Sequence, residues 1–369
     1  MTSVVLAPDS FKGSIGAAGV AAALAEGWRS VSPGDEFVLR PMADGGEGTL
    51  DAFATAVPGA RRMPVTVRGP RGGDVEASWL LLPDGTGVVE LASTSGIELL
   101  GAERRPWDAD TFGFGQAVAA ALDAGAVRLV LGIGSSASTD GGAGLLAALG
   151  ARLVDEDGRD VWPGLRGLDA LAAVELTGLR ALPVDGVTVL SDVTNPLVGP
   201  RGAAAVFGPQ KGLDAADIAR ADAALARWAA QVGAPSGMPD VPGAGAAGGT
   251  GFALLVWGAA LVAGSDEVAT RVGLSAALAG ADVVITGEGS YDAQSAAGKA
   301  PAHVAALAGE VGIPVMLAAG RIAPDADLSR FAATASLTDL AGSAEAALAD
   351  PAGWLRAAGA ALAAAHVER

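Results

Sequence analysis

Cysteine is absent from the 369-residue sequence, and histidine and lysine are scarce. Without cysteine the chain cannot form disulfides, thiolate metal sites, iron–sulfur clusters or a catalytic thiol. Its two histidines, His303 and His366, are too few for a three-histidine zinc site. Basic residues number 24 against 41 acidic ones, a formal net charge of −17. The chain therefore lacks the basic surface that nucleic acids and anionic membranes attract, and we expect neither as a partner.

Long apolar runs are also missing. Residues 1–6 lead directly into Pro8 and Asp9, without the basic and apolar segments of a secretory signal. The uncharged window 241–265 is interrupted by Pro242 and by glycines, so its apolar part is too short to span a membrane. We expect a cytoplasmic protein.

Short β-branched runs alternate with alanine-rich amphipathic stretches along the chain. A strand pattern at 4–7 precedes a helix pattern at 17–28, and a strand pattern at 127–131 precedes a helix pattern at 144–149. This alternation is typical of an α/β fold with a largely parallel sheet. The length predicts two domains, since one domain takes about 150 residues.

A second domain begins near residue 62, where the pattern changes. Three strand runs follow one another between 63 and 91, with a turn at Pro83-Asp84-Gly85, which indicates antiparallel strands. The chain returns to the first domain within or just after the glycine- and proline-rich stretch 233–251. We therefore predict a discontinuous domain of residues 1–62 plus 255–369 and an inserted domain of residues 63–254.

Lysine is used at only three positions, and the other basic residues are arginine. Lys12, Lys211 and Lys299 each lie next to a glycine. A compact ammonium group beside an unhindered backbone suits a phosphate or a carboxylate where a guanidinium would not fit. We interpret the three lysines as anion-binding residues. The single asparagine, Asn195, follows the strand pattern at 187–190 and is a similar candidate.

Acidic residues recur beside glycine or small polar residues at the ends of the predicted strands. They are Asp9, Asp44, Glu47, Asp140, Asp192, Glu288 and Asp292. Ligands of open α/β sheets bind outside the carboxyl ends of the strands, so these side chains should converge there. For each one alone, a turn or a helix cap is the more common explanation. Together with the lysines and glycine-rich backbone, they predict a site for magnesium and a transferred phosphate.

The segment Gly132–Ala137 matches the G-x-G-x-x-A dinucleotide fingerprint, with Asp155 downstream. Residues 139–142 prolong the loop, however, and delay the helix that the fingerprint requires. The hydroxyl groups of the loop favour an anion cradle instead; they belong to Ser135, Ser136, Ser138 and Thr139. Two alternatives stay open: an NAD-dependent oxidoreductase of a small hydroxy acid, and a non-catalytic sensor of a small carboxylate.

Five motifs taken together resemble the type I glycerate kinase family. They are Ala7–Gly13, Pro41–Thr49, Ser191–Leu197, Phe207–Gly212 and Thr286–Gly289, in the family's order and across nearly the whole chain. The resemblance implies phosphorylation of D-glycerate, usually to 2-phosphoglycerate, with ATP and Mg²⁺. It also implies two α/β domains with the active site in the cleft between them. The discontinuous domain would be flavodoxin-like, and the inserted domain would resemble a restriction-endonuclease fold.

The resemblance suggests roles for the candidate residues. Asp192 or Asp44 would accept the proton of the attacking hydroxyl, with Lys12 as a further catalytic residue. Substrate and phosphate would be bound by Asp9, Ser10, Lys12, Gly45, Gly46, Ser135, Ser136, Ser138, Asn195, Lys211 and Lys299. Magnesium would be held by Asp140, Glu288 and Asp292. The expected partners are the small-molecule substrates, and the expected state is a monomer or a homodimer.

The chain departs from the family's usual motifs at three positions. Ser135, Thr139 and Ser290 stand where glycine, asparagine and arginine are common. We expect these changes to affect contacts with phosphate or substrate and to leave the fold intact.

Overall fold

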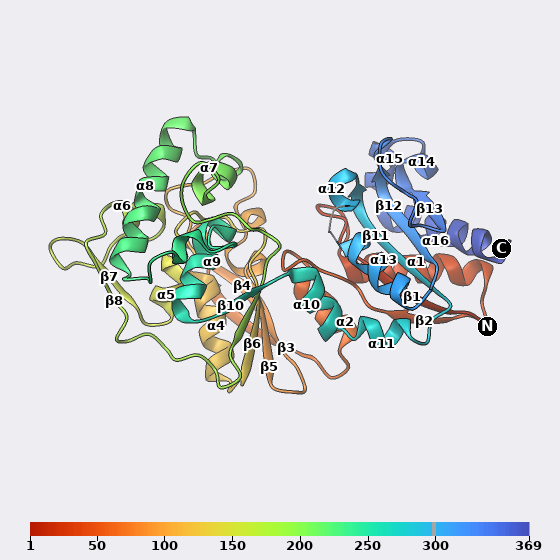
Figure 1. The fold of residues 1–369 in the computed structure, drawn as a ribbon, viewed down its shortest axis with the longest axis horizontal. Coiled ribbons are helices and arrows are strands. Elements are labelled where there is room, and N and C mark those ends of the chain that lie inside the picture. The colour runs from red at the N-terminus through yellow and green to blue at the C-terminus, as the bar shows by residue number, and fades with distance from the viewer. Residues whose placement is uncertain (297–299, 369) are drawn as a thin grey trace. The chain divides into compact units, whose positions relative to one another are not determined.

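The computed structural model describes residues 1–296 and 300–368 and divides into two compact units (Figure 1). Unit 1 comprises Met1–Pro58 and Ser265–Arg369, and unit 2 comprises Gly59–Gly264. The sequence places the boundaries at 62/63 and 254/255 instead. They differ because β3 (Arg61–Arg68) and β10 (Ala260–Val262) both pair within the sheet of unit 2.

Unit 1 is built on a five-stranded parallel sheet. Its order is β13 (Ala333–Ser336), β12 (Val315–Ile322), β11 (Val283–Tyr291), β1 (Ser3–Pro8), β2 (Glu36–Leu39). Counted within this unit the strand order is 2-1-3-4-5, the doubly wound order of flavodoxin-like sheets. The order reverses between β1 and β11. The apolar residues of these two strands are fully buried, as central parallel strands require.

Helices surround this sheet in unit 1. They are α1 (Ala17–Val31), α2 (Thr49–Ala56), α10 (Gly264–Arg271), α11 (Leu274–Leu278), α12 (Ala293–Ala296), α13 (Ala300–Glu310), α14 (Leu337–Ala341), α15 (Ala344–Ala349) and α16 (Pro351–Val367). Glycine lets α1 and α16 pack closely: a Cβ at Gly27 would lie 1.9 Å from the carbonyl oxygen of Arg356. The helix predicted at 17–28 is confirmed as α1.

Unit 2 is built on a six-stranded mixed sheet. Its order is β10, β9 (Val187–Leu190), β6 (Arg128–Gly132), β5 (Thr86–Glu90), β4 (Asp74–Leu81), β3. The first four strands are parallel, and β4 runs antiparallel to both of its neighbours. The antiparallel strands predicted between 63 and 91 are thereby confirmed, as is the mixed α/β class. The likeness to a restriction endonuclease stays a prediction.

A two-stranded antiparallel sheet and several helices complete unit 2. They are β7 (Arg152–Val154) and β8 (Ala173–Glu175), with α3 (Ala92–Ser95), α4 (Phe112–Asp123), α5 (Ala143–Ala148), α6 (Leu165–Asp169), α7 (Ala203–Phe207), α8 (Ala215–Gln231) and α9 (Ala246–Trp257), and the 3₁₀ turns η1 (Ile97–Leu100), η2 (Pro209–Lys211) and η3 (Met238–Asp240). The core of the unit includes the buried rings of Phe114, Trp228 and Phe252.

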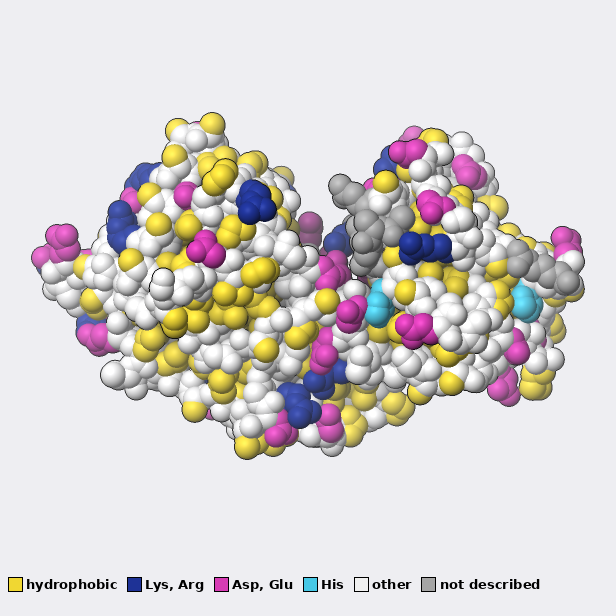
Figure 2. Space-filling model, in the orientation of Figure 1, with side chains coloured by type: hydrophobic (Ala, Val, Ile, Leu, Met, Phe, Trp, Pro, Cys, Tyr) yellow, Lys and Arg dark blue, Asp and Glu magenta, His cyan; other side chains and the backbone are white. Residues whose placement is uncertain are grey.

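The surface and the helices add two observations. On the face drawn in Figure 2, basic side chains lie singly or in small groups among acidic ones and form no continuous basic surface. In the part of the chain that the structure describes, no helix is both long enough and apolar enough to cross a membrane.

Candidate functional site

Two candidate residues meet where the strand order of unit 1 reverses. Asp9 directly follows β1, and Glu288 lies within β11. The strands pair with Pro8 opposite Gly287, and the N–H of Asp9 donates to the carbonyl oxygen of Gly287 over 2.8 Å. Asp9 and Glu288 are therefore neighbours at the carboxyl edge of the sheet, where open α/β sheets bind their ligands.

Lys12 and Asp44 lie in the loops that follow β1 and β2. The N–H of Met42 donates to the carbonyl oxygen of Pro8 over 2.8 Å, which holds the loop after β2 beside the end of β1. Asp44 accepts the N–H of Gly46 over 2.9 Å, and its other carboxylate oxygen lies 3.7 Å from Lys12 Nζ. The side chains of Lys12 and Asp44 are 66% and 41% exposed, so both are accessible to a substrate.

Two more predicted residues shape these loops. The N–H of Ser10 donates to Asp9 Oδ1 over 2.6 Å, and Ser10 itself is buried. Gly45 has a φ of 93°, a left-handed conformation that glycine adopts without steric cost. The loops thus place backbone N–H groups and side chains of both charge signs around Asp9.

The Asp9 carboxyl has an unusual electrostatic environment. Burial and then the charge of Asp44 raise its pKa to about 7, with a smaller contribution from Glu288, while the N–H of Ser10 and the ammonium of Lys12 oppose the rise. The carboxylates of Asp44 and Glu288 are therefore close enough to repel the ionised form of Asp9, and a bound cation would relieve that repulsion.

Magnesium fits this donor set. Among the described residues, no three acidic or histidine side chains are arranged as a complete metal site. Magnesium commonly takes only one or two protein carboxylates, however, and completes its shell with water and phosphate oxygens. Asp44 and Glu288 offer carboxylates of the required chemistry beside Asp9.

Asp140 organises a second group of residues, in unit 2. Its buried carboxylate accepts hydrogen bonds from the N–H and the hydroxyl of Thr111, at 2.9 and 2.8 Å, and from the hydroxyl of Ser138 at 3.0 Å. The N–H groups of Gly142 and Gly144 donate to it as well, both at 3.2 Å. Both oxygens are thus engaged within the protein. The magnesium role that the sequence predicts for Asp140 would require it to give up some of these bonds.

Lys211 is buried against residues 134–139, which we call the serine-rich loop. It is 2% exposed, and its ammonium donates to the hydroxyl of Ser136 over 2.7 Å and to the carbonyl oxygen of Ser138. Burial lowers the pKa of the ammonium to about 7, and the charge of Asp140 opposes this. A Cβ at Gly248 would lie 2.9 Å from Nζ, so the surrounding chain closes tightly on the group. In this structure Lys211 stabilises the loop from inside.

The departures from the family motifs have local structural correlates. Ser135 adopts a φ of 60°, the left-handed region in which glycine is favoured. The hydroxyl of Ser290 accepts a hydrogen bond from Arg321, its register partner on β12, over 3.1 Å. A guanidinium therefore lies beside the position where the family usually carries arginine. The buried hydroxyl of Thr139 has no hydrogen-bond partner within the described residues.

Three other predicted residues are engaged in local contacts. Asp192 is exposed just after β9 and accepts the N–H of Gly264 over 2.8 Å. The side-chain amide of Asn195 donates to the carbonyl oxygen of Arg201 over 2.8 Å. Asp292 accepts the N–H of Ser295 over 3.0 Å. Lys299 lies outside the described residues.

The predicted residues thus form two groups, one in each unit. Unit 1 holds Asp9, Ser10, Lys12, Asp44, Gly45, Gly46, Glu288 and Asp292, and unit 2 holds Ser135, Ser136, Ser138, Asp140, Lys211, Asp192 and Asn195. Sequence reasoning missed Thr111, which binds Asp140 from 29 positions away, and Arg321. No local motif marks either residue, because the fold brings them to their partners.

Comparisons with known proteins place the chain in a family. The model of the glycerate kinase family matches residues 4–367. The chain is 43% identical to the glycerate 2-kinase of Escherichia coli (strain K12), over 87% of this chain and 86% of that protein. It is also 43% identical to the glycerate kinase of Bacillus subtilis (strain 168), over 88% and 86%. A solved structure described as a glycerate kinase 2 of Salmonella typhimurium LT2 has a TM-score of 0.84 and 39% identity, covering 100% of this chain and 98% of that one. The chain belongs to the glycerate kinase family, as its five motifs predict.

Proposed function

We propose that this protein is a D-glycerate 2-kinase, which transfers the γ-phosphoryl group of ATP to the 2-hydroxyl of D-glycerate with the help of Mg²⁺. The products are ADP and 2-phosphoglycerate. The observation that carries the proposal is the group of carboxylates and an exposed lysine where β1 ends beside β11, in a chain 43% identical to a relative named glycerate 2-kinase. Phosphoryl transfer needs positioning and charge neutralisation, and this group supplies both.

Three carboxylates are candidates for accepting the hydroxyl proton. Asp44 and Asp192 are selected by the sequence. Asp9 joins them because its pKa of about 7 lies in the range where a general base works best. The exposed ammonium of Lys12 would bind the transferred phosphoryl group or the carboxylate of glycerate.

Glu288 would hold magnesium together with phosphate oxygens, and Asp44 would join it where Asp9 or Asp192 is the base. The ion, when bound, offsets the negative charge of the transferring phosphoryl group. Asp140 and Asp292 are assigned to positioning their loops, because hydrogen bonds already engage their carboxylates.

In unit 2 the hydroxyl groups of Ser135 and Ser136 would donate to an anion, since the hydroxyl of Ser138 already donates to Asp140. Lys211 and Asp140 would keep this loop in shape from below. The dinucleotide-binding alternative loses support, because α5 begins only at Ala143, well after the fingerprint Gly132–Ala137. The candidate residues are divided between the units, so the proposal requires both domains to act on one pair of substrates, as the expected interdomain site implies.

The test is phosphorus NMR of the purified protein with ATP, Mg²⁺ and D-glycerate. A 2-phosphoglycerate resonance that grows with ADP is the expected result. A 3-phosphoglycerate resonance would contradict the proposed regiochemistry, and no transfer by the folded protein would overturn the proposal. Asp9→Asn, Asp44→Asn and Asp192→Asn, compared under the same conditions, identify the base as the residue whose loss lowers kcat by orders of magnitude while KM changes little.

A further inference from the structure

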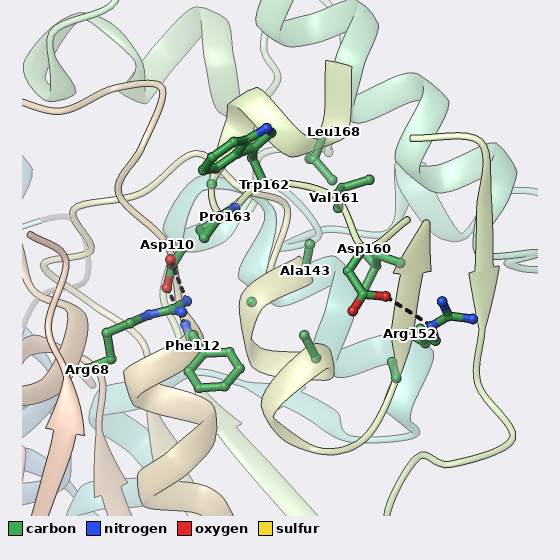
Figure 3. A pocket seen from close by; sticks show the side chains of 15 residues that line it. Arg68, Asp110, Phe112, Ala143, Arg152, Asp160, Val161, Trp162, Pro163 and Leu168 are labelled. Carbon is green, nitrogen blue, oxygen red and sulfur yellow. Dashed lines mark hydrogen bonds and ion pairs between the residues drawn. The ribbon is translucent and has the colours of Figure 1, made fainter. Parts of the chain in front are cut away.

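Unit 2 contains a pocket of about 400 Å³ that none of the predicted site residues lines (Figure 3). It is formed by α5, β7, α6, the loop 160–164 and the end of β3. Its apolar lining includes Ala143, Ala147, Leu153, Val161 and Leu168. A pocket of this size is in the range that binds small organic ligands.

Two ion pairs lie on opposite sides of the pocket in Figure 3. Arg68 contacts the buried carboxylate of Asp110 at 2.8 Å, and Arg152 contacts the exposed carboxylate of Asp160 at 2.9 Å. The four charges sum to zero, so the pocket has no excess of positive charge to attract glycerate or free phosphate. Guanidinium and carboxylate groups have further donors and acceptors that can bind the polar edge of a neutral ligand.

An exposed indole lies beside the pocket. Trp162 is 72% exposed, whereas Trp28, Trp79 and Trp228 are fully buried. Water does not solvate the faces of such a ring well, and a flat ligand stacked on it would cover them.

The loop that carries Trp162 is held in place. The N–H of Val161 donates to the carbonyl oxygen of Leu153 over 3.0 Å. At Gly164, with a φ of 76°, a Cβ would lie 2.7 Å from the carbonyl oxygen of Trp107, so the loop packs directly on that segment. The indole is therefore presented by an anchored backbone.

Hydrogen bonds to Asp140 connect the wall of the pocket to the serine-rich loop. Asp140 accepts a hydrogen bond from Gly144, which lines the pocket, and two from Thr111, which stands between the lining residues Asp110 and Phe112. The wall of the pocket and the loop proposed to bind phosphate are thus parts of one hydrogen-bonded network.

We propose that this pocket binds the adenine ring of ATP, an inference that rests on the proposed kinase function. Adenine is flat, carries no charge and has a hydrogen-bonding edge, and the pocket offers apolar walls, an exposed indole and charge-balanced polar groups. The serine-rich loop, joined to its wall, would receive the phosphate end of the same nucleotide.

Titration with adenosine, followed by tryptophan fluorescence, tests binding without any phosphate. We expect a saturable change in the wild-type protein that is lost in Trp162→Phe, competition by ATP, and no competition by inorganic triphosphate. A change of equal size in both proteins, or no change in either, would overturn the assignment.

Filling the pocket gives an independent readout. Ala147 lies in the pocket wall on α5, and Ala147→Trp should raise the KM for ATP at least about 10-fold and leave the KM for glycerate unchanged. The matched control is Ala219→Trp at an exposed position of α8, which should change neither constant. If Ala147→Trp does not fold, Trp162→Ala replaces it, since loss of one stacking contact weakens binding by about 5- to 160-fold.

The outcomes separate this inference from the proposed function. Adenosine binding without phosphoryl transfer would refute the kinase proposal alone. Phosphoryl transfer with an unchanged KM for ATP in folded Ala147→Trp would refute the adenine site alone.

Discussion

Replacing Lys211 with methionine should remove a rise of stability with pH. Desolvation lowers the pKa of this buried ammonium from 10.5 to about 7 in the folded protein. In the unfolded chain lysine keeps its ordinary pKa of about 10.4. Between these two values the unfolded state binds a proton that the folded state does not. The free energy of unfolding of the wild type therefore increases across this range.

The size of the effect follows from the shift. Each pH unit between the two pKa values adds about 1.4 kcal/mol to the free energy of unfolding. The shift of the pKa from 10.5 to about 7 therefore gives a total increase of about 5 kcal/mol. Below pH 7 both states bind the proton and the contribution is at its minimum. Between pH values of about 7.5 and 9.5, the stability of the wild type relative to Lys211→Met should rise by about 3 kcal/mol. Methionine fills a similar volume and does not titrate.

Urea unfolding at several pH values, followed by tryptophan fluorescence, measures this difference. Trp228 reports on the right region, because its indole N–H donates to the carbonyl oxygen of Gly141, next to Asp140, over 3.0 Å. Arg201→Met, which removes an exposed cation from the same unit, is the control and should keep the slope of the wild type. Equal pH dependence in the wild type and Lys211→Met would refute the reasoning, because the folded and unfolded states would then hold the Lys211 proton equally well.

Two further predictions concern Asp9 and Gly142. The pKa of Asp9 rises from 3.8 to about 7 on folding, so the ionisation of Asp9 destabilises the folded state as pH rises between these values. The free energy of unfolding of Asp9→Asn, measured with urea in EDTA, should therefore equal that of the wild type near pH 4. At pH 8 it should exceed that of the wild type by up to about 4 kcal/mol. Equal stability at pH 8 would contradict this. Gly142→Ala should cost about 1–3 kcal/mol more than Gly186→Ala in urea unfolding. Both glycines have positive φ, but of the two only Gly142 would bring a Cβ against another side chain, at 2.4 Å from Ala253 Cβ. Equal losses of stability in the two variants would show that α9, which carries Ala253, moves away without a cost in free energy.

The sequence predicts the position of Asp9 at the edge of the sheet for a simple reason. An apolar β-branched run ends where a buried parallel strand ends, and the next polar residue lies at the carboxyl edge of the sheet. Asp9 after β1 follows this rule directly. The pairing of β1 with β11, which joins residues nearly 280 positions apart, was not visible in either strand alone.

Lys211 shows where sequence reasoning stops. Its neighbour Gly212 indicates an open backbone, which we read as access for an anion. In the structure the glycine that matters is Gly248, which lets a distant segment close over the ammonium. Burial by residues 37 to 75 positions away, such as Gly248 and Ser136, leaves no mark on the local sequence. The domain boundary predicted at 254/255 lies ten residues before the division at 264/265 for a similar reason, since the three-residue strand β10 is too short to recognise before its partner β9 is known.

The pKa values of Asp9 and Lys211 are shifted in opposite directions, so the two groups destabilise the folded state at opposite ends of the pH range. Folding raises the pKa of Asp9 and lowers that of Lys211, each to about 7. The folded state therefore disfavours the charged form of both side chains. The Asp9 penalty grows as pH rises, and the Lys211 penalty grows as pH falls. The stability gained in Asp9→Asn should therefore widen toward alkaline pH, and any gained in Lys211→Met should widen toward acidic pH. A protein keeps an ionisable group that destabilises its fold where that group is needed for function, and groups with shifted pKa values cluster at functional sites. The opposite pH trends of the two variants would locate one such penalty in each unit.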